Sequence, residues 1–137
     1  MNLRRYVIIS ILVWIVFLLV ELFQHSIILK GSYLANQGFM RIGGADIMIL
    51  NLLGGLIFSF AFCYIFVKGY EGKGIMEGIR FGLIISALIW IPKVIFEYAN
   101  FNFPGTWPLM WFMFGVIATV LCGIVAAFIY RPIKKPE

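Results

Sequence analysis

The chain has 137 residues, of which 63% are hydrophobic and only 12% charged, and its mean hydropathy is +1.01. This composition lies outside the range of soluble domains and is typical of an integral membrane protein. A helix needs about 20 apolar residues to cross the hydrocarbon, so the length suits four spans with short connections and no separate soluble domain. Most enzymes built on an aqueous core are thereby excluded.

Four uninterrupted apolar runs predict four transmembrane helices, over about residues 6–28, 47–67, 81–99 and 107–130. The runs are continuous, whereas barrel strands alternate apolar and polar residues over about ten positions. Arg4 and Arg5 precede the first run, but the run is too long for a secretory signal and no A-x-A cleavage site follows. The predicted fold is therefore all-α, a four-transmembrane-helix bundle that forms a single domain over residues 1–137.

The distribution of basic residues predicts the orientation of the bundle. Eight of the eleven lie at the N-terminus, in the second connection or in the C-terminal tail, whereas the third connection has none. By the positive-inside rule both termini should be cytoplasmic. The net charge of +5 then acts as an insertion signal with some affinity for anionic headgroups, and no nucleic-acid partner is expected.

When the sequence is aligned with itself at an offset of 76 residues, the first predicted span matches the third. This alignment superimposes four pairs of the rarer residues: Arg4 on Arg80, Ser10 on Ser86, Trp14 on Trp90 and Glu21 on Glu97. This agreement favours a parallel duplication of a two-helix hairpin, with a pseudo-two-fold axis along the membrane normal. The alternative is chance similarity between two apolar helices.

Two spans carry small residues at four-residue spacing, which places them on one helix face. The predicted packing residues are Gly55 and Ser59 in the second span and Gly115, Thr119 and Gly123 in the fourth. Small faces let membrane helices approach closely. The spacing leaves open whether these faces meet within one chain or between two chains.

Six polar residues within the spans form the candidate site, all in the half of the bundle away from the predicted cytoplasmic side. They are Glu21, Gln24, His25, Asn51, Lys93 and Glu97. An ionisable group costs about 2.5 to 3.5 kcal/mol at the centre of a membrane helix, so each needs a partner or a function. Pairing of Glu21 with His25, and of Lys93 with Glu97, one turn apart, would give a purely structural network.

The charge balance of this cluster suggests a functional alternative. Two carboxylates face one ammonium, so one carboxylate lacks a fixed cation. A protonated His25, a protonated carboxyl group or a ligand cation would supply the missing charge. The cluster would then be a binding site for a lipid-like ligand, or for a proton or cation.

Metal binding by Glu21, His25 and Glu97 is a weaker hypothesis. Known zinc and di-iron sites use more histidines or a denser carboxylate set, and one histidine cannot supply both axial ligands of a low-spin haem. The sequence therefore leaves metals and cofactors undefined.

Pro92, next to Lys93, cannot donate a hydrogen bond to the carbonyl of Leu88. It predicts a bend in the third span, either a passive kink or a hinge. The first connection, residues 29–46, mixes Tyr33 and Phe39 with glycines, which suits a segment lying in the membrane interface. Such a segment could cap the polar cluster.

Several short stretches carry a resemblance to other proteins. They are His25, Lys30-Gly31, Tyr33, Arg41, Gly69-Tyr70-Glu71-Gly72-Lys73-Gly74, Glu77-Gly78, Arg80-Phe81-Gly82 and Ile129-Tyr130-Arg131. With them the chain resembles small four-helix bacterial inner-membrane proteins that have no assigned activity. The resemblance implies a bacterial inner-membrane location and no particular reaction. The motifs of small multidrug exporters, fluoride channels and glutathione-handling four-helix enzymes are not found.

Three functions remain as hypotheses. The first is a bundle that self-associates, or docks on a larger membrane complex, and uses its polar cluster structurally or to hold a lipid-like ligand. The second is transport of protons, cations or a small solute through Glu21, His25, Lys93 and Glu97. The third is a membrane enzyme with Glu21 or His25 as general base, which lacks an adjacent nucleophile. We favour the first, because small proteins without a catalytic constellation are more often components than catalysts.

Overall fold

The computed structural model describes residues 2–39 and 44–130, and over these residues it is all-helical, without strands. The long helices are α1 (Leu3–Phe23), α3 (Ala45–Lys68), α4 (Ile75–Asn100) and α5 (Thr106–Ile129). A π-helical turn, η1 (Gln24–Ile28), extends α1, and the first connection contains the short helices α2 (Lys30–Ala35) and η2 (Gln37–Phe39). Arg41 and the basic residues of the tail lie outside the described residues.

Four helices are long and apolar enough to cross a membrane, which confirms the predicted transmembrane helices. They run over Leu3–Ile28, Ala45–Lys68, Ile75–Asn100 and Thr106–Ile129. The third begins six residues before the apolar run at 81, because Glu77 holds its first turn in place. The Glu77 carboxylate accepts hydrogen bonds from the backbone N–H groups of Glu71 (2.6 Å) and Lys73 (2.7 Å).

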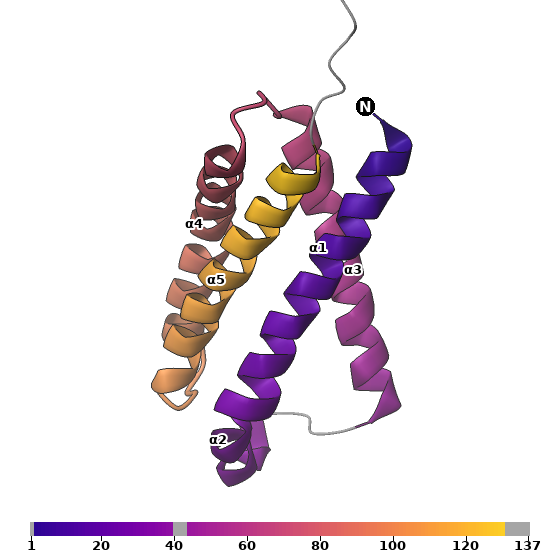
Figure 1. The fold of residues 1–137 in the computed structure, drawn as a ribbon. Helices are drawn as coiled ribbons and strands as arrows, with labels where there is room; N and C mark the ends of the chain where they lie inside the picture. The colour runs from indigo at the N-terminus through magenta and orange to yellow at the C-terminus, as the bar shows by residue number, and fades with distance from the viewer. Residues whose placement is uncertain (1, 40–43, 131–137) are drawn as a thin grey trace, which may run out of the picture.

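The four long helices alternate in direction (Figure 1). The start of α1 and the end of α5 lie at one end of the molecule, and α2 and the α4–α5 turn lie at the other. In the packing, α1 contacts both α3 and α5, and α4 packs along α5. The central pair is therefore α1 and α5, with α3 and α4 on its flanks.

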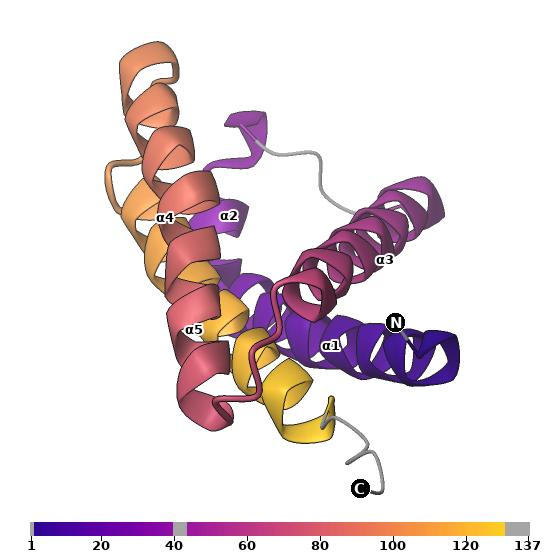
Figure 2. The ribbon, with the colours of Figure 1, turned by 90° about the horizontal axis from the view of Figure 1, so that it is seen from above.

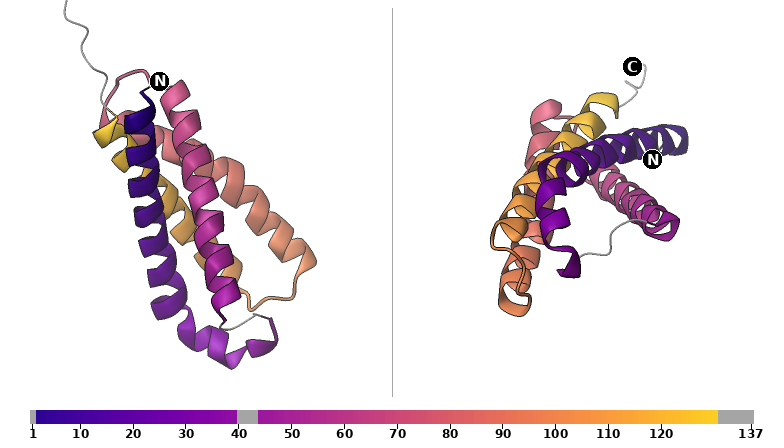
Figure 3. Two further views of the ribbon diagram at one scale, coloured as in Figure 1. Left: turned by 90° about the vertical axis from the view of Figure 1, so that its right-hand side faces the viewer. Right: turned by 90° about the horizontal axis from the view of Figure 1, so that it is seen from below.

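The bundle is splayed (Figures 2 and 3). Near the end that holds the termini, Phe81 of α4 contacts Phe62 and Phe66 of α3, with ring centroids 4.8 and 5.3 Å apart. Toward the α2 end, α3 and α4 diverge. At this end, α3 of the first hairpin (α1 and α3) therefore lies apart from α4 of the second hairpin (α4 and α5).

The two small-residue faces are both used within the chain, and they do not pack on each other. A Cβ at Gly55 of α3 would lie 3.3 Å from Nε1 of Trp14 in α1, so this face receives a tryptophan. On α5, Gly115 lies against the indole of Trp90, and Gly123 lies opposite the backbone of Gly78.

Hydroxyl groups reinforce these contacts. Ser59 and Thr119 each donate to the carbonyl of the residue one turn earlier, at 2.8 and 2.9 Å. Thr119 also lies 2.5 Å from the Ser86 hydroxyl of α4. All five predicted packing residues are buried at these helix contacts.

A second apolar core lies at the α2 end, separate from the core near the termini. Leu29 and Tyr33, one turn apart, pack on Trp107 and Trp111 at the start of α5. The Trp107 indole also donates to the hydroxyl of Ser32 at 2.7 Å. The described start of the first connection is therefore folded back onto α5, and its role as a cap on the polar cluster stays a prediction.

Candidate functional site

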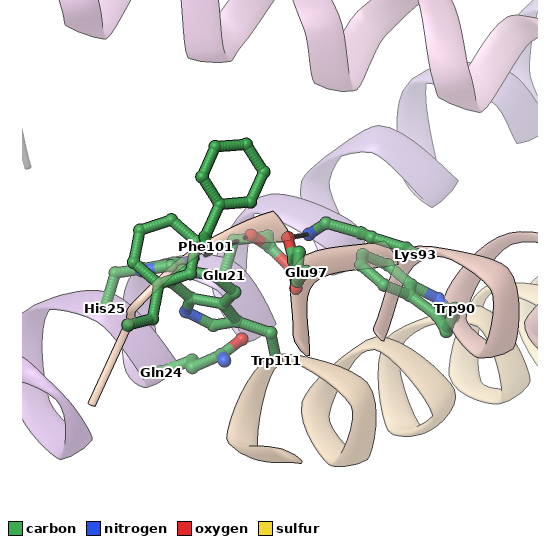
Figure 4. Close-up of a pocket in the computed structure, with 9 residues that line it drawn as sticks. Glu21, Gln24, His25, Trp90, Lys93, Glu97, Phe101 and Trp111 are labelled. Atoms are coloured by element: carbon green, nitrogen blue, oxygen red, sulfur yellow. Dashed lines mark ion pairs between the residues drawn. The ribbon is translucent and has the colours of Figure 1, made fainter. Parts of the chain in front are cut away.

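A cavity of about 360 Å³ lies at the α2 end of the bundle, between α1 with its π-helical turn, α4, the α4–α5 turn and α5 (Figure 4). This volume lies within the usual range of small-molecule pockets, about 300–1,000 Å³. The residues that line it are Glu21, Gln24, His25, Trp90, Lys93, Glu97, Phe101, Phe103 and Trp111. Its polar groups come from two helices, and its aromatic walls come from α4, α5 and the turn between them.

Five of the six predicted site residues meet in this cavity. Glu21, Gln24 and His25 come from the end of α1, and Lys93 and Glu97 come from α4. Asn51 lies elsewhere, exposed on α3, and does not line the cavity. The predicted depth of Asn51 in the membrane matched that of the other site residues, but α3 diverges from α4 at this end of the bundle.

A hydrogen-bonded chain runs along one side of the cavity. The Trp111 indole donates to the Tyr33 hydroxyl (2.9 Å), and that hydroxyl lies 2.6 Å from Nδ1 of His25. On the far side of the ring, Nε2 of His25 lies 3.3 Å from the carboxylate of Glu21. The indole N–H can only donate, whereas the Tyr33 hydroxyl can both donate and accept, so the tautomer of His25 sets which of Tyr33 and Nδ1 is the donor.

Tyr33, which bonds His25, was not predicted as a site residue, and neither were the aromatic lining residues Trp90, Phe101, Phe103 and Trp111. Tyr33 is only 8% exposed, and burial raises the pKa of its phenol above the ordinary value of 10.0, an effect that the bond from Trp111 partly offsets. A phenol that resists ionisation is a poor nucleophile, although it is placed beside His25. The spacing of Leu29 and Tyr33, one helical turn apart in an interfacial segment, was the signal that could have found it.

Lys93 lies on the aromatic wall of the cavity. Its Nζ is 4.8 Å from the ring centroid of Trp90 and 5.2 Å from that of Trp111. It is 3.6 Å from a carboxylate oxygen of Glu97, which is an ion pair beyond hydrogen-bonding distance. The predicted pairing of Lys93 with Glu97 is therefore present but loose, and cation–π contacts provide much of the ammonium's environment.

Three buried polar atoms of lining residues have no hydrogen-bond partner among the described residues: Nε2 of Gln24, Nε1 of Trp90 and Oε2 of Glu97. Gln24 is 1% exposed and Glu97 is 8% exposed. An unsatisfied buried polar group costs about 1–3 kcal/mol, and more if it is charged. The cavity thus holds both an unsatisfied acceptor and unsatisfied donors, which an entirely structural network would have paired.

The two carboxylates of the site come from opposite hairpins. In Figure 4, Glu21 and Glu97 point into the same part of the cavity. Each also has a basic group one turn away on its own helix, His25 for Glu21 and Lys93 for Glu97. Besides His25, the cavity is thus lined by two carboxylates and one ammonium group, that of Lys93.

Pro92 lies within α4, which continues from Ile75 to Asn100 without a break. Neither Pro92 nor Leu88 lines the cavity. The role of Pro92 as a hinge stays a prediction.

No group of three or more His, Cys, Asp or Glu side chains close enough to hold a metal ion occurs in the described part of the chain. The cysteines, Cys63 and Cys122, are both buried and free. Comparison of the chain with protein-family models, with curated proteins and with solved structures finds no match. The function is therefore argued from the geometry of the cavity.

Proposed function

We propose that this chain is a membrane protein that binds a lipid-like molecule in the cavity between α1 and α4, as a self-associating unit or as a subunit of a larger membrane complex. One observation carries the proposal: a pocket of about 360 Å³ with aromatic walls is lined by residues whose buried donor and acceptor atoms have no partner in the described part of the chain. Ligand pockets combine an apolar lining with a few convergent polar groups in this way.

The position of the cavity favours a ligand drawn from the bilayer. It lies at one end of the spanning helices, beside an interfacial segment that contains α2. The same stretches of α1 and α4 expose large apolar side chains, such as Leu22 at 61% and Phe96 at 59%. An amphiphile can place its polar group in the cavity and its apolar part along these faces.

The orientation belongs to the same proposal. We place both termini in the cytoplasm of a bacterial cell, with the protein in the inner membrane, because five of the seven basic residues in the described part of the chain lie toward the end where α1 begins and α5 ends. The cavity then opens in the outer leaflet.

Equivalent contacts in the two hairpins support the proposed duplication. Trp14 lies on Gly55 as Trp90 lies on Gly115. One turn after each of these glycines, a hydroxyl residue donates to the glycine's carbonyl. Glu21 and Glu97 also correspond to each other at the offset of 76 residues. The cavity that both residues line then lies between the two proposed repeats, as the binding sites of many transporters do.

Native mass spectrometry of the full chain, gently extracted from its membranes, tests the binding function. We expect one lipid-sized mass for each chain, and a severalfold lower occupancy in Phe101→Ala, which removes part of the wall. Phe128→Ala, similarly exposed on α5 at the other end, is the matched control. Ions that carry no lipid under conditions that preserve lipid adducts on other membrane proteins would overturn the proposal. The same spectra report the oligomeric state and any second polypeptide.

A second candidate, transport of a proton or cation, rests on the two carboxylates that share the cavity from opposite hairpins. Intramembrane carboxylates commonly mark ion pathways. Flux into liposomes should then fall at least tenfold in Glu21→Gln and Glu97→Gln, while Glu71→Gln at the other end remains active. Equal flux in all three variants would end this candidate.

A further inference from the structure

The polar atoms of the cavity specify a ligand with two kinds of group. The unpartnered atom Oε2 of Glu97 needs a donor, whereas the amide nitrogen of Gln24 needs an acceptor. Both side chains are more than nine-tenths buried and line the same cavity. A purely cationic ligand would satisfy only the first, and a purely anionic ligand only the second.

The carboxylates and aromatic walls favour a cationic nitrogen at one end of the ligand. The cavity is lined by two carboxylates, Glu21 and Glu97, and by one ammonium group, that of Lys93. The walls already hold one alkylammonium group, that of Lys93, at 4.8 and 5.2 Å from two indole rings. A second ammonium beside Glu97 would balance the charge of the site.

The nitrogen should be a primary ammonium and not a quaternary one. A buried carboxylate oxygen without a partner is satisfied by an N–H group, and a quaternary ammonium has none. Lys93 does not provide this N–H group, because its Nζ lies 3.6 Å from the other carboxylate oxygen of Glu97.

The donors favour an anionic group next to that ammonium. Lys93 has no hydrogen bond to Glu97 at 3.6 Å, and Gln24 adds a buried N–H donor in the same cavity. An ammonium and an amide together suit the oxygens of a phosphate. The ligand group is therefore a zwitterion whose positive and negative ends are separated by a short linker.

We infer that the cavity binds a primary ammonium joined through a short linker to a phosphate, as in the headgroup of an ethanolamine phospholipid. The inference rests on the proposed function and deepens it, because it names the headgroup of the lipid-like ligand. Glu97 and Glu21 receive the ammonium, Lys93 and Gln24 donate to the phosphate, and the indole rings exclude water. The site lies near the helix ends, at the level where headgroups meet a bilayer protein.

Native mass spectrometry of the full chain in detergent tests this directly, with added lysolipids as probes. We expect lysophosphatidylethanolamine to bind about tenfold more tightly than lysophosphatidylcholine or lysophosphatidylglycerol, a difference of about 1.4 kcal/mol. Glu97→Gln and Glu21→Gln should reduce this preference to less than about twofold, and Lys93→Gln should weaken binding of the ethanolamine lipid. The matched control, Glu71→Gln in the exposed loop at the other end, should keep the full preference.

Each other outcome has a definite meaning. Equal affinity for the three lysolipids would overturn the headgroup assignment and leave the proposed function standing, whereas no binding of any lysolipid would overturn both. Water-soluble phosphoethanolamine binding as tightly as the lysolipid would show that the ligand is a free solute, and would overturn the lipid assignment. Thermal unfolding of each variant, followed by circular dichroism, identifies a loss of lipid binding that is caused by unfolding. If Glu97→Gln does not fold, the Glu21→Gln variant provides the test.

Discussion

At the residue scale, Tyr33 decides how the site is organised. Its hydroxyl accepts from Trp111 and is hydrogen-bonded to Nδ1 of His25, so one atom connects α2 with both η1 and α5. The sequence predicted only one partner for His25, Glu21, because only pairs one turn apart on a helix are visible in the sequence. The contact from Tyr33 depends on the path of the chain after the π-helical turn, which no local pattern specifies.

Replacing Tyr33 with Phe should destabilise the protein by about 1–3 kcal/mol, because it leaves the Trp111 N–H and Nδ1 of His25 without their partner. Tyr98→Phe is the control, since Tyr98 is 54% exposed and its hydroxyl donates to the carbonyl of Gly105. Thermal unfolding of both variants in detergent measures the difference. An equal loss of stability in the two variants would contradict the proposed role of Tyr33.

The raised pKa of Tyr33 gives a prediction in alkaline solution. Burial disfavours the phenolate, so Tyr33 should ionise after the exposed tyrosines, above pH 10. A group whose pKa is raised on folding stabilises the fold below its unfolded pKa, and this contribution is lost as the pH rises through the folded value. Tyrosinate absorbance should therefore show a late component that Tyr33→Phe removes. A late component of the same size in that variant would assign it to another tyrosine.

Lys93 and Glu97 can be tested as a pair. Lys93→Met strands the buried Glu97 carboxylate and should cost about 1–3 kcal/mol, whereas Lys93→Met combined with Glu97→Gln should cost less. Melting temperatures in detergent compare the two variants. Equal values would show that the two groups are energetically independent.

At the element scale, close helix contacts depend on glycines that lie opposite backbone. Gly78 and Gly82 of α4 face Gly123 and Thr119 of α5, and a Cβ at Gly82 would lie 2.6 Å from the carbonyl oxygen of Thr119. The small face of α5 was evident from its four-residue spacing. Its partner on α4 has the same spacing, in Gly78, Gly82 and Ser86, but Arg80 and the preceding Glu77 conceal it in a search for apolar runs.

Gly78→Ala should therefore separate α4 from α5 and destabilise the protein by about 1–3 kcal/mol, since its methyl group would overlap the carbonyl of Gly123. Gly54→Ala on α3 is the matched control, because a Cβ there has nothing within 4 Å. Unfolding followed by circular dichroism should show a loss for the first variant and none for the second. Two equally stable variants would refute the close packing of α4 on α5.

At the scale of the whole molecule, hydropathy and charge were sufficient to predict four spanning helices and most of the polar cluster. Both are properties of local sequence, because one helix fixes the spacing of Glu21 and His25 or of Lys93 and Glu97. Which helices pack together is not local, and for that reason Asn51 was assigned to the cluster at the right depth on a helix that leans away from it.

The proposed orientation can be tested by labelling, because the two native cysteines are buried and free. Cysteines introduced as Glu71→Cys and Asn102→Cys lie in exposed connections at opposite ends of the bundle. Under the positive-inside rule, a membrane-impermeant maleimide should label the second in intact cells and the first only after the membrane is opened. The unsubstituted protein should give almost no background. The reverse pattern would place the cavity in the inner leaflet, where a headgroup ligand would come from the cytoplasmic monolayer.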